Sequence, residues 1–311
     1  MNLPSPHVLV LLSTYNGEHY LVELLDSLYA QTTQNFSLWV RDDGSSDRTL
    51  EILRQYRTCH DNITLIEGSN IGVIGSFMTL VRECSVEPGQ LYAFCDQDDI
   101  WFPEKLARAT VNITAAKNPS AALYCSRLIY TDNALHPIGT SAIPRFFGFE
   151  NALVENVAIG CTMVFGEIIR QKMLAANPER MMMHDWWAYL VAGAFGEVIY
   201  DSEPGIYYRQ HATNTVGWNK RLTGMLRKSR GFLANILKDR QGLQSLRQAA
   251  CFLETYPELA SEKQATIREI LSLREHSGLW VRYRFLRQTK IQRNHALENF
   301  ILNLTILLNL H

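Results

Sequence analysis

The sequence of 311 residues lacks an apolar run that could cross a membrane, which needs about 20 consecutive residues. Its most apolar stretch, residues 300–310, is short and is interrupted by Asn303 and Asn309. The first residues also lack the basic start and the small-residue cleavage site of a signal peptide. We therefore expect a cytoplasmic protein with no membrane-spanning helix.

Cysteine is scarce as well. Six cysteines lie scattered between residues 59 and 251, without a CxxC pair and without histidines at zinc-finger spacing. We expect reduced thiols, most of them buried as small apolar side chains. The overall content of 47% hydrophobic and 20% charged residues is that of an ordinary globular protein, which excludes collagen-like and disordered chains.

The net charge of −1 conceals an uneven distribution. Residues 1–217 hold 14 Lys and Arg against 24 Asp and Glu, a balance of −10, whereas residues 218–311 hold 16 against 7, a balance of +9. We therefore predict an acidic globular domain over residues 1–217 and a basic region over residues 218–311. The basic region would either face an anionic partner or pack on the acidic domain.

Strand and helix patterns alternate through the first part of the chain. The predicted strands are 7–13, 36–40, 62–66 and 91–95, and the predicted helices are 18–31, 46–56, 74–84 and 103–115. Ser45 or Ser46 is the expected cap of the second helix. This alternation predicts an α/β fold with a mostly parallel sheet, helices on both faces and ligands at the carboxyl ends of the strands.

The alternation stops near residue 120. Segments 121–130 and 158–165 have strand character, so the sheet is expected to become mixed there. After residue 217 the strand signals vanish, and helical spacing predicts a C-terminal α-helical appendage over residues 219–240, 241–256, 260–276 and 280–309.

Three carboxylates follow the predicted strand 91–95, at Asp96, Asp98 and Asp99. Such close carboxylates repel one another, and their burial is costly unless a cation or hydrogen-bond donors compensate. Mg²⁺ or Mn²⁺ takes carboxylate and phosphate oxygens, so the cluster suits metal-bridged binding of a diphosphate. The alternative is a solvated acidic turn in which Asp99 caps the next helix.

Two more polar loops are expected at the same edge of the sheet. They are residues 13–17 (STYNG) after the first strand and residues 41–47 (RDDGSSD) after the second. Side chains there can accept hydrogen bonds from ribose hydroxyls or from a pyrimidine N–H. The second loop alone would equally suit a turn followed by a helix cap.

These segments resemble the nucleotide-sugar-binding domain of inverting family 2 glycosyltransferases, which have the Rossmann-like GT-A fold. The matching stretches are LLSTYNGEHYLVELLDSLYAQ, WVRDDGSSDRTLEIL and FCDQDDIWFPEKL. The resemblance extends to about residue 217, and DQDDIW, HDWW and YRQH are similar to the bacterial rhamnosyltransferase-like branch. It implies transfer of a sugar, such as rhamnose, from a dTDP- or UDP-linked donor to a glycan acceptor of a cell-surface polysaccharide such as O-antigen.

The resemblance also implies roles for single residues. The base and ribose contacts fall on Thr14, Tyr15, Asn16 and Asp43. The DxD motif of the family falls on Asp96, near the ribose, and Asp98, the direct ligand of Mg²⁺ or Mn²⁺. The remaining donor contacts fall on Asn70, Arg209 and His211, which would otherwise be a plain loop residue, a surface ion pair and a loop histidine.

The catalytic base of the family falls on Asp185 in the segment HDWW. An inverting transfer needs a carboxylate that takes the proton of the acceptor hydroxyl as its oxygen attacks the anomeric carbon. Trp186 and Trp187 can raise the basicity of that carboxylate and offer a stacking face for a sugar. The alternative is a helix-capping aspartate followed by core tryptophans.

The basic residues of segment 280–293, followed by FILNLTILLNL, predict peripheral contact of residues 280–311 with the inner face of the cell membrane, where lipid-linked acceptors are held. A helical cap or a dimer contact accounts for this segment equally well. Few aromatics are interleaved with the basic residues, which disfavours nucleic acid as a partner. A nucleotidyltransferase is disfavoured because no glycine-rich phosphate loop follows the first strand. An inactive binding module of the same fold stays open as the alternative function.

Overall fold

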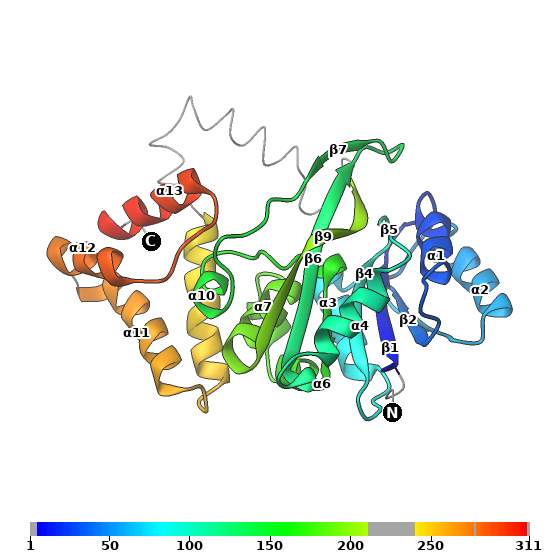
Figure 1. Ribbon diagram of the computed structural model, residues 1–311, viewed down its shortest axis with the longest axis horizontal. Helices are drawn as coiled ribbons and strands as arrows, with labels where there is room; N and C mark the ends of the chain where they lie inside the picture. Colours follow the sequence, from blue (N-terminus) through cyan, green and yellow to red (C-terminus); the bar gives the residue numbers. More distant parts are fainter. Residues whose placement is uncertain (1–4, 211–239, 277, 310–311) are drawn as a thin grey trace.

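The computed structural model describes residues 5–210, 240–276 and 278–309 (Figure 1). The predicted domain boundary after residue 217, the predicted helix 219–240 and the predicted donor contact His211 lie outside these residues. Within the described part of the chain, no helix is both long and apolar enough to span a lipid bilayer. The six cysteines are free thiols, and all except Cys59 are buried, as expected.

The four strands predicted in the first part of the chain are confirmed and lie side by side. They are β1 (Val8–Thr14), β2 (Phe36–Asp42), β3 (Ile63–Glu67) and β4 (Leu91–Asp96), which pair in parallel in the order β3-β2-β1-β4. The apolar runs of the inner strands β1 and β4 are buried on both faces, as is usual in a parallel sheet covered by helices, whereas β3 at the edge buries only Ile63.

The sheet continues with strands of mixed direction. Next to β4 follow β8 (Val164–Gly166), β6 (Ala122–Thr131), β9 (Glu197–Arg209) and β5 (Ile100–Trp101), while β7 (Pro137–Thr140) pairs with β6. The pairs β4–β8, β6–β8 and β5–β9 are antiparallel, whereas β6–β9 is parallel. The expected mixed sheet is therefore confirmed.

Three local predictions are wrong. The predicted helix 280–309 is divided into the helices Leu279–Gln288 and Ala296–Leu307, because the backbone is extended at Thr289 and His295. Segment 158–165 is a strand only from Val164, because residues 160–162 form a 3₁₀ turn. The second helix begins at Thr49 rather than after Ser45 or Ser46, because Asp47 accepts the backbone N–H of Thr49 at 3.0 Å.

The helices cover both faces of the sheet. In the first part of the chain they are α1 (Leu21–Tyr29), α2 (Thr49–Cys59), α3 (Gly72–Glu83), α4 (Lys105–Thr114), α5 (Phe149–Ala152), α6 (Glu167–Leu174) and α7 (His184–Phe195). Short 3₁₀ turns lie at Pro119–Ala121, Gly160–Thr162 and Pro178–Arg180. The appendage consists of α10 (Arg240–Thr255), α11 (Ser261–His276), α12 (Leu279–Gln288) and α13 (Ala296–Leu307).

Alternating side chains of β1 divide the apolar core into two parts. Val8, Val10 and Leu12 join the buried side chains of α1 and α4, whereas Leu9 and Leu11 join those of α3, α6 and α7. This division follows from the two-residue period of a strand. It confirms the predicted arrangement of a sheet between two layers of helices.

Helix α10 packs on α7, so the described part of the basic region lies against the acidic part of the chain. Figure 1 shows α10 beside α7, with α11 to α13 beyond it. Phe252 and Tyr256 belong to the same apolar cluster as Trp187, whose indole N–H donates to the Tyr256 hydroxyl at 3.2 Å. The division into two domains at residue 217 stays a prediction.

We predict that Phe252→Ala destabilises the whole protein by about 3–5 kcal/mol, because it empties a fully buried site between α7 and α10. Urea unfolding followed by circular dichroism measures this change. Val111→Ala, on an exposed face of α4, is the control and should change the free energy of unfolding by less than about 0.5 kcal/mol. Equal stability of the two variants would contradict the packing described here.

Candidate active site

Parallel pairing brings the three polar loops to one edge of the sheet. Thr14 pairs with Asp42 across β1 and β2, and Ser13 pairs with Asp96 across β1 and β4. The three strands therefore end at the same level, and the loops that follow them are neighbours. This confirms the convergence predicted from the sequence.

The first loop is held by both of its neighbours. Gln97 accepts the backbone N–H of Tyr15 at 2.8 Å and donates to its carbonyl oxygen at 3.0 Å. Asn16 donates its backbone N–H to the Ser45 hydroxyl at 2.9 Å and accepts from the backbone of Ser46 at 2.8 Å. The Tyr15 ring is half exposed and is free to lie against a flat ligand.

Thr14 is buried, unlike Tyr15 and Asn16. Its hydroxyl donates to Asp42 at 3.0 Å, and the same carboxylate accepts the backbone N–H groups of Gly44 at 3.2 Å and Ser45 at 2.8 Å. Gly44 has a φ of 81°, a conformation that suits glycine. Asp42 and Thr14 therefore fix the turn of the second loop.

Asp43 ties the second loop to the start of α3. Its carboxylate accepts from the Arg41 guanidinium at 2.5 Å and from the backbone N–H groups of Ile71 and Gly72 at 2.9 Å each. The side chain is almost fully buried. Asn70 lies next to this contact, and its side-chain oxygen accepts from Gly72 at 3.2 Å. The contact with a nucleobase that the sequence predicts for Asp43 stays a prediction.

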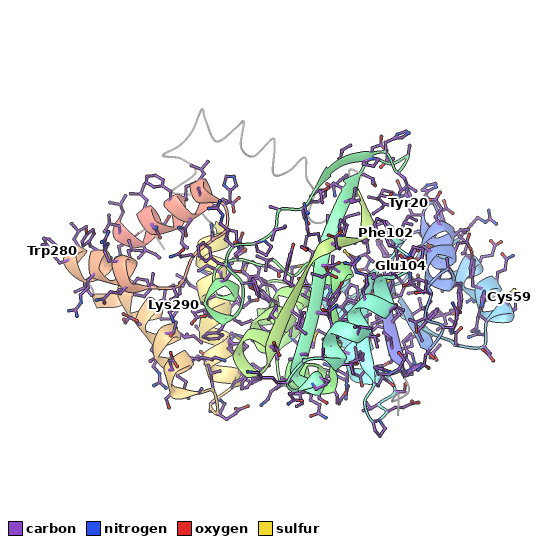
Figure 2. The ribbon with its side chains drawn as sticks, in the orientation of Figure 1. Tyr20, Cys59, Phe102, Glu104, Trp280 and Lys290 are labelled. Carbon is purple, nitrogen blue, oxygen red and sulfur yellow. The ribbon has the colours of Figure 1, made fainter. Side chains whose placement is uncertain are left out.

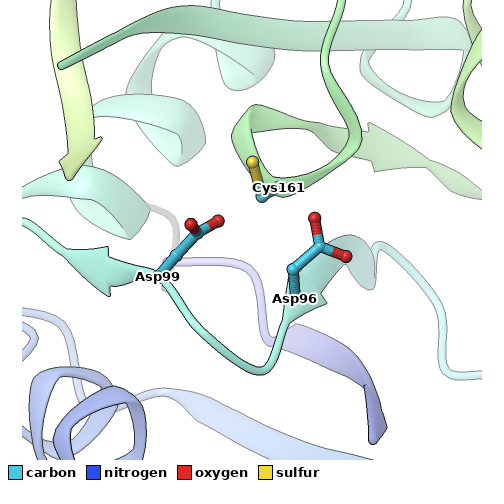
Figure 3. Close-up of side chains that lie close together, drawn as sticks. All are labelled: Asp96, Asp99 and Cys161. Carbon is cyan, nitrogen blue, oxygen red and sulfur yellow. The ribbon is translucent and has the colours of Figure 1, made fainter. Parts of the chain in front are cut away.

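The third loop gathers acidic groups under a turn from a distant part of the chain. Figure 3 shows Asp96, Asp99 and the thiol of Cys161 facing one another, and their nearest ligand atoms all lie within 4.8 Å. The sequence pairs Asp96 with Asp98 as metal ligands, whereas this cluster contains Asp99 and Cys161. Cys161 carried no sequence signal, because it stands alone in an apolar run.

Burial makes this cluster electrostatically strained. Burial first, and then the charges of Asp98 and Asp185, raises the pKa of Asp96 to about 8. Burial likewise raises the pKa of Asp99 well above its ordinary range. Within the described residues, neither carboxylate oxygen of Asp99 has a hydrogen-bond partner. A buried carboxylate without donors is costly, and a bound cation would relieve that cost.

Lys105 supplies a buried positive charge behind the loop, a feature that sequence analysis missed. Its ammonium lies 3.2 Å from the centre of the Trp101 ring. Burial lowers its pKa to about 8, although the charges of Cys95, Cys161 and Asp99 act in the opposite direction. The signal was present in the segment FPEKL, where a lysine stands on the apolar face of α4.

Arg209 is at the edge of the site, where its guanidinium holds protein groups together. It donates to the carbonyl oxygens of Asp98 at 3.1 Å and Asn133 at 2.5 Å, and it forms an ion pair with Glu23 of α1. It also lies over the ring of Tyr20. Arg209 therefore positions the acidic loop, and the predicted contact with a diphosphate stays untested.

Asp185 stands in the first turn of α7, beside the acidic loop. Its carboxylate accepts the backbone N–H groups of Gly160 at 2.9 Å and Trp186 at 2.6 Å. Burial raises its pKa to about 6, and these hydrogen bonds limit the rise. The absence of a side chain at Gly160 permits the contact, because a Cβ there would lie 3.2 Å from the Asp185 Cβ. The charge of Asp185 reaches Asp96 and raises the pKa of Asp96.

His184 precedes this carboxylate and is buried in an apolar site. Its ring stacks on Phe77, with centroids 3.9 Å apart, and meets the edge of Phe94. Among the described residues neither ring nitrogen has a hydrogen-bond partner, and burial lowers the pKa of His184 to about 3. The ring is therefore neutral and forms part of the apolar wall beside Asp185.

The comparison with protein families identifies the class. The family model of glycosyl transferase family 2 matches residues 9–176, which is more than half of the chain. The chain belongs to this family and is a glycosyltransferase.

Two curated relatives illustrate the range of the family. The dTDP-rhamnosyl transferase RfbG of Shigella flexneri is 30% identical over 220 residues, which cover 67% of this chain and 74% of that protein. The UDP-Glc:alpha-D-GlcNAc-diphosphoundecaprenol beta-1,3-glucosyltransferase WfgD of Escherichia coli is 29% identical over 157 residues, 50% of this chain and 58% of that protein.

Solved structures share the fold at low identity. S. aureus TarS 1–349, in complex with UDP-GlcNAc, has a TM-score of 0.55 and 17% identity, with 96% of this chain and 91% of that chain covered. The mannosyltransferase PcManGT of Pyrobaculum calidifontis, in complex with GDP-Man and Mn²⁺, has a TM-score of 0.52 and 16% identity, with 98% and 86% covered. These likenesses confirm the predicted GT-A fold.

We predict that His184→Phe makes the stability of the protein less sensitive to acid. The folded pKa of His184, about 3, is below its ordinary value of 6.5, so the neutral ring stabilises the fold above pH 6.5 and this contribution is lost as pH falls. Between about pH 7 and about pH 4.5 the parent should lose about 2 kcal/mol more than the variant.

Urea unfolding across this pH range measures the difference. His19→Gln, which removes an exposed histidine, is the control and should follow the parent. Parallel pH curves for the parent and His184→Phe would show that the ring is not buried in its neutral form.

Proposed function

We propose that this glycosyltransferase moves a sugar from a nucleoside diphosphate donor to a glycan hydroxyl with inversion, and that Asp185 is the general base. One observation carries this proposal: a single turn joins Asp185 to the acidic loop, because Gly160 donates its backbone N–H to Asp185 at 2.9 Å and the next residue, Cys161, lies within 4.8 Å of Asp96 and Asp99. A base and a donor loop within electrostatic reach of each other suit a single displacement. The carboxyl ends of β1, β2 and β4 supply the donor loops around them.

The donor nucleotide would lie across the first two loops. Tyr15 and Asn16 are exposed there and can contact the nucleobase. Asp43 and Asn70 would lie on the side of the second loop that faces the start of α3. Asp96 would meet the ribose. Arg209 would act on the diphosphate through the loop whose Asp98 carbonyl it holds.

The site fits a divalent cation. Asp99 has two buried oxygens without partners in the described residues, next to Asp96 and Asp98. Mg²⁺ and Mn²⁺ prefer carboxylate oxygens to a thiol, so we assign the ion to the carboxylates rather than to Cys161. Mg²⁺ or Mn²⁺, when bound, would offset the negative charge that develops on the departing diphosphate.

Asp185 would take the proton of the acceptor hydroxyl. The acceptor oxygen forms a bond to the anomeric carbon while the bond from that carbon to the diphosphate oxygen breaks, and the released proton moves to the Asp185 carboxylate. The backbone N–H groups of Gly160 and Trp186 hold this carboxylate in one orientation. A pKa of about 6 leaves it ionised at neutral pH and still more basic than an exposed aspartate.

The finer assignment rests on the curated relatives. Because RfbG is named as a dTDP-rhamnosyl transferase, we propose rhamnose on dTDP as the donor, with a UDP-linked sugar as the alternative that WfgD suggests. The name of WfgD also supports a lipid-linked acceptor in the synthesis of a cell-surface polysaccharide. Such an acceptor would place the enzyme at the inner face of the cell membrane.

We predict that Asp185→Asn lowers turnover by about 10² to 10⁴-fold, because an amide cannot accept the proton. Release of nucleoside diphosphate from the donor measures turnover with or without an added acceptor. Calorimetric affinity for the donor should stay within about twofold of the parent, since Asp185 acts on the acceptor side. Asp61→Asn, an exposed change after α2, is the matched control and should leave both quantities unchanged.

The pH profile offers a second readout of the same residue. Because the ionised carboxylate is the base, kcat/KM should rise with pH through about 6 and level off above it. Full activity of Asp185→Asn would remove Asp185 from the mechanism. Loss of donor binding in that variant would assign it to the donor site instead.

We predict that a matching nucleotide stabilises the protein only when a divalent metal is present. The test is a thermal-shift panel of dTDP, UDP, GDP and their sugar conjugates, each with and without Mg²⁺ or Mn²⁺. One nucleotide of the panel, together with metal, should raise the Tm of the protein by about 2–4 °C at saturation. Asp98→Ala and Asp96→Asn should lose this metal-dependent shift, while Asp61→Asn keeps it. A shift of equal size without metal would refute the metal site, and a preference for UDP or GDP would refute dTDP.

A further inference from the structure

The segment 280–311, for which the sequence predicts membrane contact, forms two helices that differ in the apolar side chains they expose. Helix α13 buries Ile301, Leu302 and Ile306, and Leu302 and Ile306 belong to the apolar cluster of the C-terminal helices. The apolar side chains exposed on or directly after α13 are Phe300 and Leu308, which lie about two helical turns apart. A larger and more compact group of exposed apolar side chains lies on α12.

Helix α12 exposes such side chains at its first turn. Leu279, Trp280 and Val281 are 60%, 81% and 56% exposed, and Tyr283 is 48% exposed. Large apolar side chains seldom gather in this way on a surface that meets only water. Figure 2 shows Trp280 at one end of the long axis of the molecule, opposite Cys59.

This helix is also basic and firmly placed. Arg284, Arg287 and Lys290 are exposed on it or directly after it, and the sequence of α12 contains no acidic residue. Phe285 is buried beneath it, and Arg282 donates to the carbonyl oxygen of Leu307 in α13 at 3.0 Å. The exposed surface is therefore a fixed part of the fold.

The side chains of this surface match an anionic lipid bilayer. Trp280, Tyr283, Arg284 and Arg287 follow one another at helical spacing, so the aromatic and basic groups share one side of α12. Tryptophan and tyrosine favour the level of the lipid headgroups, and arginine and lysine attract anionic headgroups. The exposed apolar side chains Leu279 and Val281 would make no favourable contact with the phosphates of a nucleic acid, whereas they can enter the boundary between the headgroups and the acyl chains of a bilayer.

We propose that the exposed side of α12, formed by Leu279, Trp280, Val281, Tyr283, Arg284 and Arg287, docks the protein on a membrane that contains anionic lipid. This inference goes beyond the transfer reaction, and it rests on the proposed function only in that a lipid-linked acceptor would be found at the same surface. Binding is measured without donor or acceptor, so its failure would leave the transfer proposal intact.

The test is co-sedimentation of the full chain with vesicles of phosphatidylglycerol and phosphatidylcholine, compared with phosphatidylcholine alone. The parent should bind the anionic vesicles, and high salt should weaken the binding. Trp280→Ala/Tyr283→Ala and Arg284→Gln/Arg287→Gln should each lower the partition coefficient by about tenfold or more. Brominated lipids should quench the tryptophan fluorescence of the parent more than that of Trp280→Phe.

Two matched controls should bind like the parent. Val86→Ala/Val111→Ala removes exposed apolar side chains elsewhere, and Arg48→Gln/Arg54→Gln removes the same charge from α2. The proposal is overturned if the parent does not bind vesicles, or if the controls lose as much binding as the α12 variants. It is also overturned if α12 variants instead lose salt-dependent RNA binding, or convert a dimer seen by ultracentrifugation into a monomer.

Discussion

The burial of several carboxylates side by side at the edge of one sheet is the constraint on which the site depends. Asp96, Asp99 and Asp185 cannot all stay ionised in a poorly hydrated space without compensation, which is why the pKa of each is raised. The protein compensates them unequally. Asp185 receives two backbone N–H groups at 2.9 Å and 2.6 Å, whereas no donor among the described residues lies at full hydrogen-bonding geometry to Asp99, and only smaller effects of the Cys161 thiol and the Arg209 backbone offset its burial. The negative charge of these carboxylates therefore favours a cation at the loop of Asp96 and Asp99 and a proton acceptor at Asp185, at the start of α7. The proposed metal site and the proposed base would thus be two results of one arrangement of charges.

The contacts around these carboxylates fix the loops before a ligand arrives. Gln97 joins the third loop to the first, and Arg209 joins the acidic loop to α1 through Glu23. Asp43, which sequence reasoning assigned to the nucleobase, holds the start of α3. A site ordered in this way loses little conformational freedom on binding. Residues that resemble ligand contacts in the sequence thus also serve to position the loops that carry the contacts.

The sequence predicted well what depends on neighbouring residues and on strand direction. Parallel strands that end in polar loops must bring those loops together, so the convergence of the loops that carry Asp43 and Asp96 followed from periodicity alone. The contacts of Asp185 with Gly160 and of Asp99 with Cys161 join segments far apart in the chain, and no local pattern encodes them. The apolar run of segment 158–165 predicts a strand, but such a run can be buried equally well in a turn, so periodicity does not separate the two. Helical spacing likewise predicted C-terminal helices, but it could not show that α12 and α13 are separate or that α12 exposes more of its apolar side chains than α13.

The C-terminal helices connect the surface of the molecule to α7, the helix that carries the proposed base. Trp187, two residues after Asp185, packs against Phe252 and Tyr256 of the α10 segment, and the same apolar cluster continues to Phe285 of α12 and Ile306 of α13. Because packed cores deform little, a contact made by α12 would orient the whole molecule and would not merely move one helix. A membrane bound at α12 would therefore hold the acceptor side of the site at a constant angle to the bilayer. For an acceptor anchored in lipid, that fixed angle would replace part of the orientational freedom that binding otherwise has to remove.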